Sequence, residues 1–206
     1  MNIAPDRKAR DLLTQAAAWR LASLLLERPH AEWKNEIVKL CGEVTDQELS
    51  SCMREVDQAT EESYHRIFGP GGTVSPREVS YCGFEDPGRL MAELSAFYQA
   101  FSFQPRREEP IDHIAVEAGF VGYLFLKEAY ARMQENSEAA EITKNARERF
   151  IKDHVGRCAQ GMIQRLSDSP PYLRKVLLWL GEKTPNMPAA EPLSSNRDPC
   201  GGTYVR

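Results

Sequence analysis

The chain lacks the marks of exported, membrane-spanning and disulfide-stapled proteins. Its longest apolar runs, such as residues 24–26 and 176–180, fall short of the roughly 18 to 20 residues needed to cross a bilayer. The N-terminal segment MNIAPDRK is charged where a signal peptide would be apolar. The five cysteines form no C-x-x-C pair, which disfavours a disulfide framework and a thiolate metal site. These absences predict a soluble protein of the reducing cytoplasm, without stable membrane insertion.

The chain also has little excess of charge of either sign. The formal net charge is −4 over 206 residues, and no run of lysines and arginines stands out. We therefore expect no nucleic-acid partner, since such proteins carry a clustered basic surface. With 42% hydrophobic residues, the chain can bury one sizeable core. We expect a single domain over residues 1–182, and a mobile or surface-laid tail over residues 183–206, which has four prolines and little periodicity.

What the sequence does contain is apolar residues at helical spacing in nearly every long segment. This pattern predicts an all-α fold, a single-domain bundle of about seven or more helices. A T-x-x-E capping box at Thr45 marks the start of the third of them. The predicted helices cover residues 6–27, 31–41, 45–68, 88–103, 114–133, 139–166 and 172–180.

An irregular segment of nearly twenty residues, 69–87, interrupts the helices. Loops of this length are uncommon inside compact domains and often functional. Its glycines do not make a phosphate-binding loop, because the Lys-Ser/Thr pair is absent and no strand precedes it. We interpret the segment as a connector, and Glu78 and Tyr81 could line a groove beside it.

The most informative motif is EPIDH, residues 109–113, just before the predicted helix 114–133. Pro110 suits a first helical turn, and Asp112 lies close enough to accept from free backbone N–H groups. On a helix, His113 and Glu117 would share one face, because they are four residues apart. The motif can therefore be a simple helix start, an acid–base pair or part of a binding site.

Two chemical readings of this motif are weaker. His113 and Glu117 lack a third ligand at helical spacing, so we expect no metal site and no bound cofactor. A hydrolase that uses His113 with Asp112 would need a nucleophile, and adjacent residues on a helix point about 100° apart, which is poor geometry for a relay. We expect no catalytic residues. A general helical adaptor fits the periodicity equally well.

Three segments together resemble the TorD-like family of molybdoenzyme maturation chaperones, the TorD/DmsD/NarJ group. They are residues 64–70 (YHRIFGP) with 75–81 (SPREVSY), residues 109–117 (EPIDHIAVE) and residues 150–155 (FIKDHV). The middle segment resembles the family's E-P-x-D-H signature. Two positions depart from the family pattern: Arg77 stands where an aromatic residue is usual, and Cys158 where a tryptophan is usual.

This resemblance implies a function without covalent chemistry. Proteins of this kind bind the twin-arginine signal peptide or the apoprotein of a molybdopterin-dependent oxidoreductase, delay its export and assist insertion of the molybdenum cofactor. Both monomers and domain-swapped homodimers occur among them, and residues 69–87 are a suitable hinge for exchange. A receptor for such a peptide needs carboxylates beside a hydrophobic groove. The predicted client-binding residues are Glu109, Pro110, Asp112, His113, Glu117, Glu78, Tyr81, Phe84 and Phe120.

Overall fold

The computed structural model describes residues 6–57, 59–83, 85–105, 109–166 and 169–184. The described residues are mostly helical and contain no β-strand, which confirms the predicted all-α fold. Phe84 and the tail after Thr184 lie outside the described residues. The α-helices are α1 (Arg7–Leu26), α2 (Trp33–Cys41), α3 (Gln47–Val56), α4 (Glu61–Phe68), α5 (Pro87–Ala100), α6 (Ile114–Met133), α7 (Ser137–Phe150), α8 (Gly156–Arg165) and α9 (Pro171–Lys183). A 3₁₀ turn, η1 (Glu78–Tyr81), and a π-helical turn, η2 (Ile151–Val155), complete them.

The predicted third helix, residues 45–68, is wrong in one respect, because it is two helices. The N-cap of α3 is Asp46, not Thr45, and its carboxylate accepts from the backbone N–H groups of Glu48 and Leu49 at 3.1 and 3.3 Å. A second helix start follows at Thr60, whose side chain caps α4 in a reciprocal pair with Ser63. Serine takes the place of the usual Glu or Gln of a capping box, so the pattern did not reveal the break.

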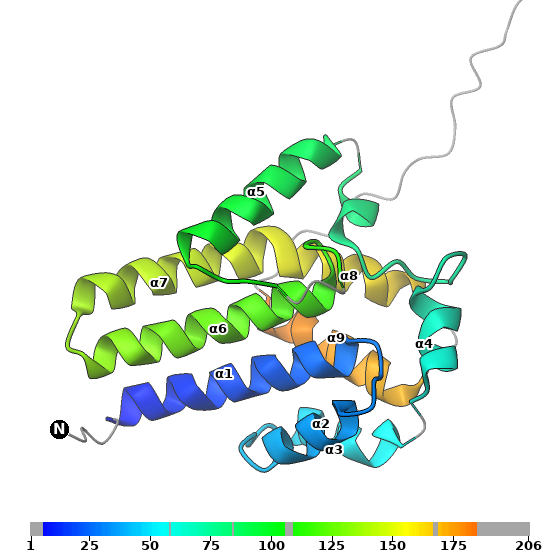
Figure 1. The fold of residues 1–206 in the computed structure, drawn as a ribbon, viewed down its shortest axis with the longest axis horizontal. Helices are drawn as coiled ribbons and strands as arrows, with labels where there is room; N and C mark the ends of the chain where they lie inside the picture. The colour runs from blue at the N-terminus through cyan, green and yellow to red at the C-terminus, as the bar shows by residue number, and fades with distance from the viewer. Residues whose placement is uncertain (1–5, 58, 84, 106–108, 167–168, 185–206) are drawn as a thin grey trace, which may run out of the picture.

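Three helical segments lie side by side in the middle of the molecule (Figure 1). The chain runs one way through α1, returns through α6 and turns back again through α7 and α8, while α9 crosses behind them. The closest approach is between α1 and α6. A Cβ atom at Gly122 would lie 3.2 Å from both Ala16 O and Arg20 N, closer than an ordinary van der Waals contact, so glycine at this position favours the close approach of the two backbones.

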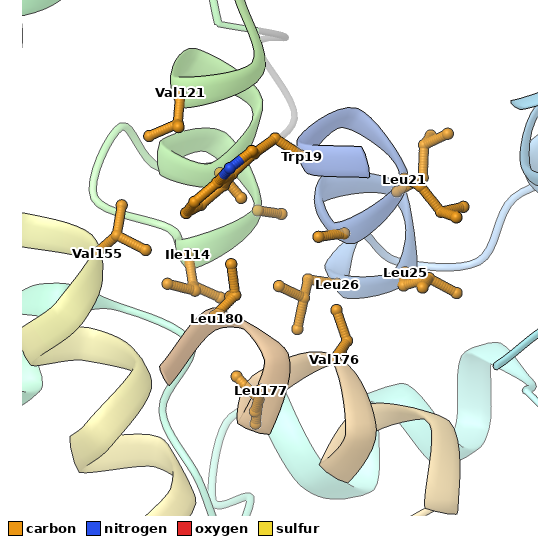
Figure 2. Close-up of a cluster of buried hydrophobic side chains, with 14 of the residues drawn as sticks. Trp19, Leu21, Leu25, Leu26, Ile114, Val121, Val155, Val176, Leu177 and Leu180 are labelled. Atoms are coloured by element: carbon orange, nitrogen blue, oxygen red, sulfur yellow. The ribbon is translucent and has the colours of Figure 1, made fainter. Parts of the chain in front are cut away.

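The hydrophobic core fills the space between α1, α6, α8 and α9 (Figure 2). Trp19 and Leu26 of α1 meet Ile114 of α6 and Leu180 of α9 there. Trp19 also packs edge-on against Trp179, with ring centroids 5.2 Å apart. These side chains are almost completely buried, and burial of each is worth about 1.5 to 3 kcal/mol.

The long predicted helix 139–166 is continuous but not regular. Its α-helical halves, α7 and α8, are joined by the π-helical turn η2, which carries His154. After this turn, α8 packs against the 3₁₀ turn η1. The Tyr81 ring lies against the bare backbone of Gly161, where a Cβ atom would be only 2.6 Å from Tyr81 Cγ. Gly161 thus makes room for the 3₁₀ turn of the connector.

We expect Gly161→Ala to destabilise the protein even though alanine is the better helix former. The added methyl must displace the Tyr81 ring, and such overpacking costs about 1 to 3 kcal/mol. Gly181→Ala in α9 is the matched control, because its Cβ would meet only the flexible end of Ile163 at 3.3 Å. Thermal unfolding followed by circular dichroism should show a lower midpoint for the first variant and an unchanged or higher one for the second. Equal midpoints would contradict this packing.

Candidate functional site

The connector, residues 69–86, is attached to the start of α6 by backbone hydrogen bonds. The N–H of Glu78 donates to the carbonyl of Asp112 at 2.8 Å, and the N–H of Ile114 donates to the carbonyl of Pro76 at 2.9 Å. Arg77 and His113 form an isolated antiparallel bridge between these bonds. The EPIDH motif and the segment with Glu78 and Tyr81 therefore lie side by side.

Asp112 is fully buried, and its side chain bonds to the connector. Its carboxylate accepts from Arg77 Nε at 2.9 and 3.2 Å and more distantly from the Val79 N–H at 3.4 Å. The expectation that Asp112 accepts from the first turn of α6 is wrong, because His113 occupies the N-cap position and the Asp112 side chain turns to Arg77 and η1 instead. Arg77, one of the two departures from the family pattern, is thus the partner of the motif's aspartate.

His113 is the N-cap of α6. Its Nδ1 accepts from the Ala115 N–H at 3.1 Å, so the proton of the neutral ring is on Nε2, which lies 3.0 Å from the Tyr64 hydroxyl. The carboxylate of Glu109 lies 3.6 Å from the same nitrogen. Burial, and to a smaller extent the charge of Arg77, lowers the pKa of His113 to about 4. His113 is therefore a neutral structural group that joins α4 to α6.

Glu117 lies one turn further along α6 and is fully buried. As a carboxylate, it would have no hydrogen-bond donor at either oxygen. Burial raises the pKa of Glu117 well above its ordinary value, the charges of Glu78 and Asp112 raise it further, and Glu78 accepts a hydrogen bond from the neutral form. Glu117 is therefore protonated, and in this form it donates a hydrogen bond to Glu78. Glu78 also accepts from His154 Nδ1, which lies 3.1 and 3.2 Å from its two oxygens.

A separate apolar groove of about 640 Å³ lies along α1 and α6. Its apolar lining comes from Leu13, Ala16, Phe103, Val116, Tyr123 and Leu126, and its carboxylates come from Glu27, Glu43 and Glu109. Arg20 and Arg28 also line it, and Arg20 is bonded to Glu27 at 2.9 Å. Because α1 and α6 are antiparallel, Glu27 lies with the start of α6 at one end, and Leu13 lies with Leu126 at the other. The groove thus has a carboxylate-bearing end and an apolar end.

The structure distributes the predicted site residues over two places. Glu109 is half-buried and lines the groove. Five others are buried in or beside the polar cluster and do not line the groove: Glu78, Asp112, His113, Glu117 and Phe120. Pro110 is exposed, and Tyr81 is half-buried against Gly161. Their contact with a client stays a prediction, whereas in this structure the buried five support the corner from which Glu109 reaches the groove.

Sequence reasoning missed most of the groove. Its lining combines residues from α1, α2, α6 and the segment around Phe103, which are far apart in the chain. The one available signal was the small residues Ala16, Gly119 and Gly122, which leave α1 and α6 thin where they face each other. Within the described ranges, no group of three His, Cys, Asp or Glu residues is arranged to hold a metal ion. In the same ranges, no helix is both long and apolar enough to cross a membrane.

The shift of the His113 pKa predicts a loss of stability in acid. Protonation favours the unfolded state, whose histidine titrates near 6.5, so stability is complete above that pH and falls by about 3 kcal/mol as the pH drops to 4. His113→Asn keeps an N-cap side chain but removes this titration. In urea titrations, the wild type should lose unfolding free energy as the pH falls from 6.5 to 4, and the variant should lose less. The difference, variant minus wild type, should therefore rise over this range. A pH-independent difference would contradict the shift.

The raised pKa of Glu117 predicts a loss of stability in the opposite direction, as the pH rises. An acid whose pKa is raised in the folded state costs stability once the unfolded group ionises, so stability declines as the pH rises above about 4.5, by up to about 1.4 kcal/mol per pH unit. Glu117→Gln stays neutral and can still donate to Glu78. The stability gained by this variant should therefore increase from about pH 5 to about pH 8. A gain that is constant over this range would show that Glu117 is ionised in the folded protein.

Comparison with known proteins supports the resemblance found in the sequence. No curated protein matches the chain. The family model described as "Nitrate reductase delta subunit" matches residues 26–162, which include all three signature segments, the connector and the start of α6. This match covers more than half of the chain. The chain therefore belongs to the nitrate reductase delta subunit family, a family of chaperones that act in molybdoenzyme maturation.

Proposed function

We propose that the protein is a cytoplasmic chaperone that binds the N-terminal leader of a molybdopterin-dependent oxidoreductase in the groove along α1 and α6. The leader would be a twin-arginine signal peptide, held back from export until the molybdenum cofactor has entered the enzyme. The single observation that carries this proposal is a groove of about 640 Å³ with an apolar wall along α1 and α6 and with the carboxylates of Glu27 and Glu109 at one end. This volume lies within the range of specific ligand sites.

The polarity of the groove supports one direction of binding. A leader has arginines ahead of an apolar stretch, so its guanidinium groups would lie at the end with Glu109 and Glu27, and its apolar part would run towards Leu13 and Leu126. From Leu13 to Glu27 the groove follows α1 for about 20 Å, at 1.5 Å per residue. This length accommodates a short peptide segment and not a folded domain.

The relative strengths of the contacts follow from their exposure. An exposed ion pair contributes about 0.2 to 1 kcal/mol, whereas apolar burial contributes about 25 cal/mol for each Å² removed from water. Affinity would come mainly from the apolar wall, and Glu109 would set the register of the peptide. Since Glu109 is held 3.6 Å from His113 Nε2, its position depends on the buried cluster behind it.

The buried motif bears on two other possibilities, catalysis and domain swapping. Asp112 and His113 are 0% and 1% exposed and do not line the groove, and we propose no catalytic activity. A domain swap through the connector would rebuild the contacts of Asp112 with Arg77 and of Glu78 with His154 between two copies of the chain, so these contacts are compatible with both a monomer and a domain-swapped homodimer.

The apolar wall can be tested with a matched pair of leucines. Leu126 lines the groove and is 48% exposed, and Leu178 is 42% exposed on α9, away from the groove. We expect Leu126→Asp to weaken binding of a fluorescent twin-arginine leader peptide by at least about tenfold, the equivalent of 1.4 kcal/mol, because it places a charge on the surface that the peptide buries. Leu178→Asp should bind normally. Fluorescence anisotropy gives both affinities, and equal effects of the two would place the peptide elsewhere.

The identity of the client needs a separate experiment. Affinity capture from native cells followed by mass spectrometry should recover a molybdopterin oxidoreductase with its leader still attached, and Leu126→Asp should reduce the yield. Capture of such an enzyme that has no leader would move the proposal to recognition of the apoprotein core. Proteins unrelated to molybdoenzymes, captured equally by both forms, would favour a general adaptor.

A further inference from the structure

A second, smaller cavity of about 240 Å³ lies between the start of α5 and the π-helical turn η2 with the start of α8. It shares no lining residue with the groove. Its lining is rich in charged groups, with carboxylates from Glu85, Asp86, Glu93 and Asp153, and guanidinium groups from Arg89 and Arg157. Carboxylates thus outnumber cations by four to two, which makes the cavity acidic.

His154 is a buried group of this cavity with an unused binding position. The residue is 2% exposed and lines the cavity, and its Nδ1 is held by both oxygens of Glu78. Its Nε2 has no hydrogen-bond partner, and Glu93 Oε1 lies 4.0 Å away. With the ring proton on Nδ1, Nε2 is an acceptor. A buried acceptor without a donor is costly, so its presence calls for an explanation.

The chemistry of the lining narrows the class of ligand. An anion is disfavoured by the excess of carboxylates, and a nucleotide also by the size, since the cavity is smaller than the 300 to 1,000 Å³ typical of small-molecule sites. A metal ion would need a third ligand, which no cluster in the described part of the chain supplies. A compact organic cation with N–H donors satisfies both the imidazole and the carboxylates.

We propose that this cavity binds a guanidinium group, which donates one N–H to His154 Nε2 and others to Glu93 and Asp153. Guanidinium is planar, always charged and carries five donors, so it can meet an imidazole nitrogen and carboxylates at once. The protein itself shows that such a group fits these carboxylates. Arg149 bridges Glu93 at 3.3 Å and Asp153 at 3.4 Å, with its guanidinium 5.6 Å from the centre of the Phe97 ring.

Arg149 is also the competitor of the proposed ligand. Its side chain is 64% exposed, so its movement into solvent would break only the two ion pairs and the contact with the face of the Phe97 ring. This geometry distinguishes two substitutions that break the same ion pair. Glu93→Gln removes a charged acceptor of the ligand, whereas Arg149→Gln frees the acceptors from their present partner. The two variants should lose similar stability but change guanidinium binding in opposite directions.

The test is a titration of the ¹⁵N-histidine-labelled full chain with methylguanidinium, with the Nε2 resonance of His154 as the readout. We expect a saturable shift, binding about tenfold weaker in Glu93→Gln and about threefold tighter in Arg149→Gln, as the loss and the release of one charge-assisted contact imply. Glu62→Gln, an exposed carboxylate on α4, is the control and should bind like the wild type. Tetramethylammonium has the charge but no N–H donor and should not bind.

Several outcomes would overturn the proposal. They are the absence of a saturable shift, equal binding of tetramethylammonium, and weaker binding in Arg149→Gln. Two further probes compare a guanidinium group on a polypeptide with one on a free small molecule. They are N-acetyl-arginine amide and agmatine, and the neutral citrulline amide serves as a blank. Tighter binding of the arginine amide than of agmatine assigns the site to an arginine of a polypeptide, and the reverse assigns it to a free small molecule. Binding of neither would contradict the site altogether.

Discussion

The attachment of the connector to the start of α6 is the contact on which the other features depend. Two backbone hydrogen bonds place Glu78 over the buried end of α6, and the Asp112 carboxylate secures the position by accepting from Arg77. The removal of carboxylates from water is expensive, and their partners offset the cost only when every group is satisfied. Here the protonated Glu117 and His154 complete the set around Glu78. If one member were lost, the others would be left buried and unpaired.

This arrangement also explains why the motif and the groove are different places. The motif's aspartate and histidine are buried and face the connector and α4. Glu109, from the same motif, lines the groove. Because His113 Nε2 contacts both Tyr64 and Glu109, the buried side of the corner sets the position of its exposed side. A strong sequence signature can therefore mark the support of a binding surface, and the surface itself can consist of ordinary apolar residues.

The predictable part of the structure is the part that depends on local pattern. Helical periodicity located α1, α6 and the long helix through residues 139–166, because each has an apolar face of many residues. The break before Thr60 escaped notice, since its reciprocal partner is Ser63, and so did the true N-cap of α6, since Asp112 and His113 are both plausible there. Arg77 could be noted only as unusual. Its pairing with Asp112, and the groove formed by Leu13 and Leu126, require distances across the fold that no spacing in the chain encodes.

The π-helical turn at Ile151–Val155 has a consequence for how this chain can vary in length. A regular α-helix advances 100° per residue, so the wider turn offsets the faces of α7 and α8 relative to an uninterrupted helix. With this offset, Phe150 faces the core before the turn, His154 faces Glu78 within it, and Gly161 faces Tyr81 after it. Because an i→i+5 turn holds one residue more than an α-helical turn, deletion of a single residue here would give a regular helix and leave α7 and α8 facing nearly as they do now. A deletion elsewhere in α7 or α8 would instead rotate everything beyond it by about 100°, away from these partners. The π-helical turn is therefore the place in this long helix where the chain can lose a residue with the least effect on its packing.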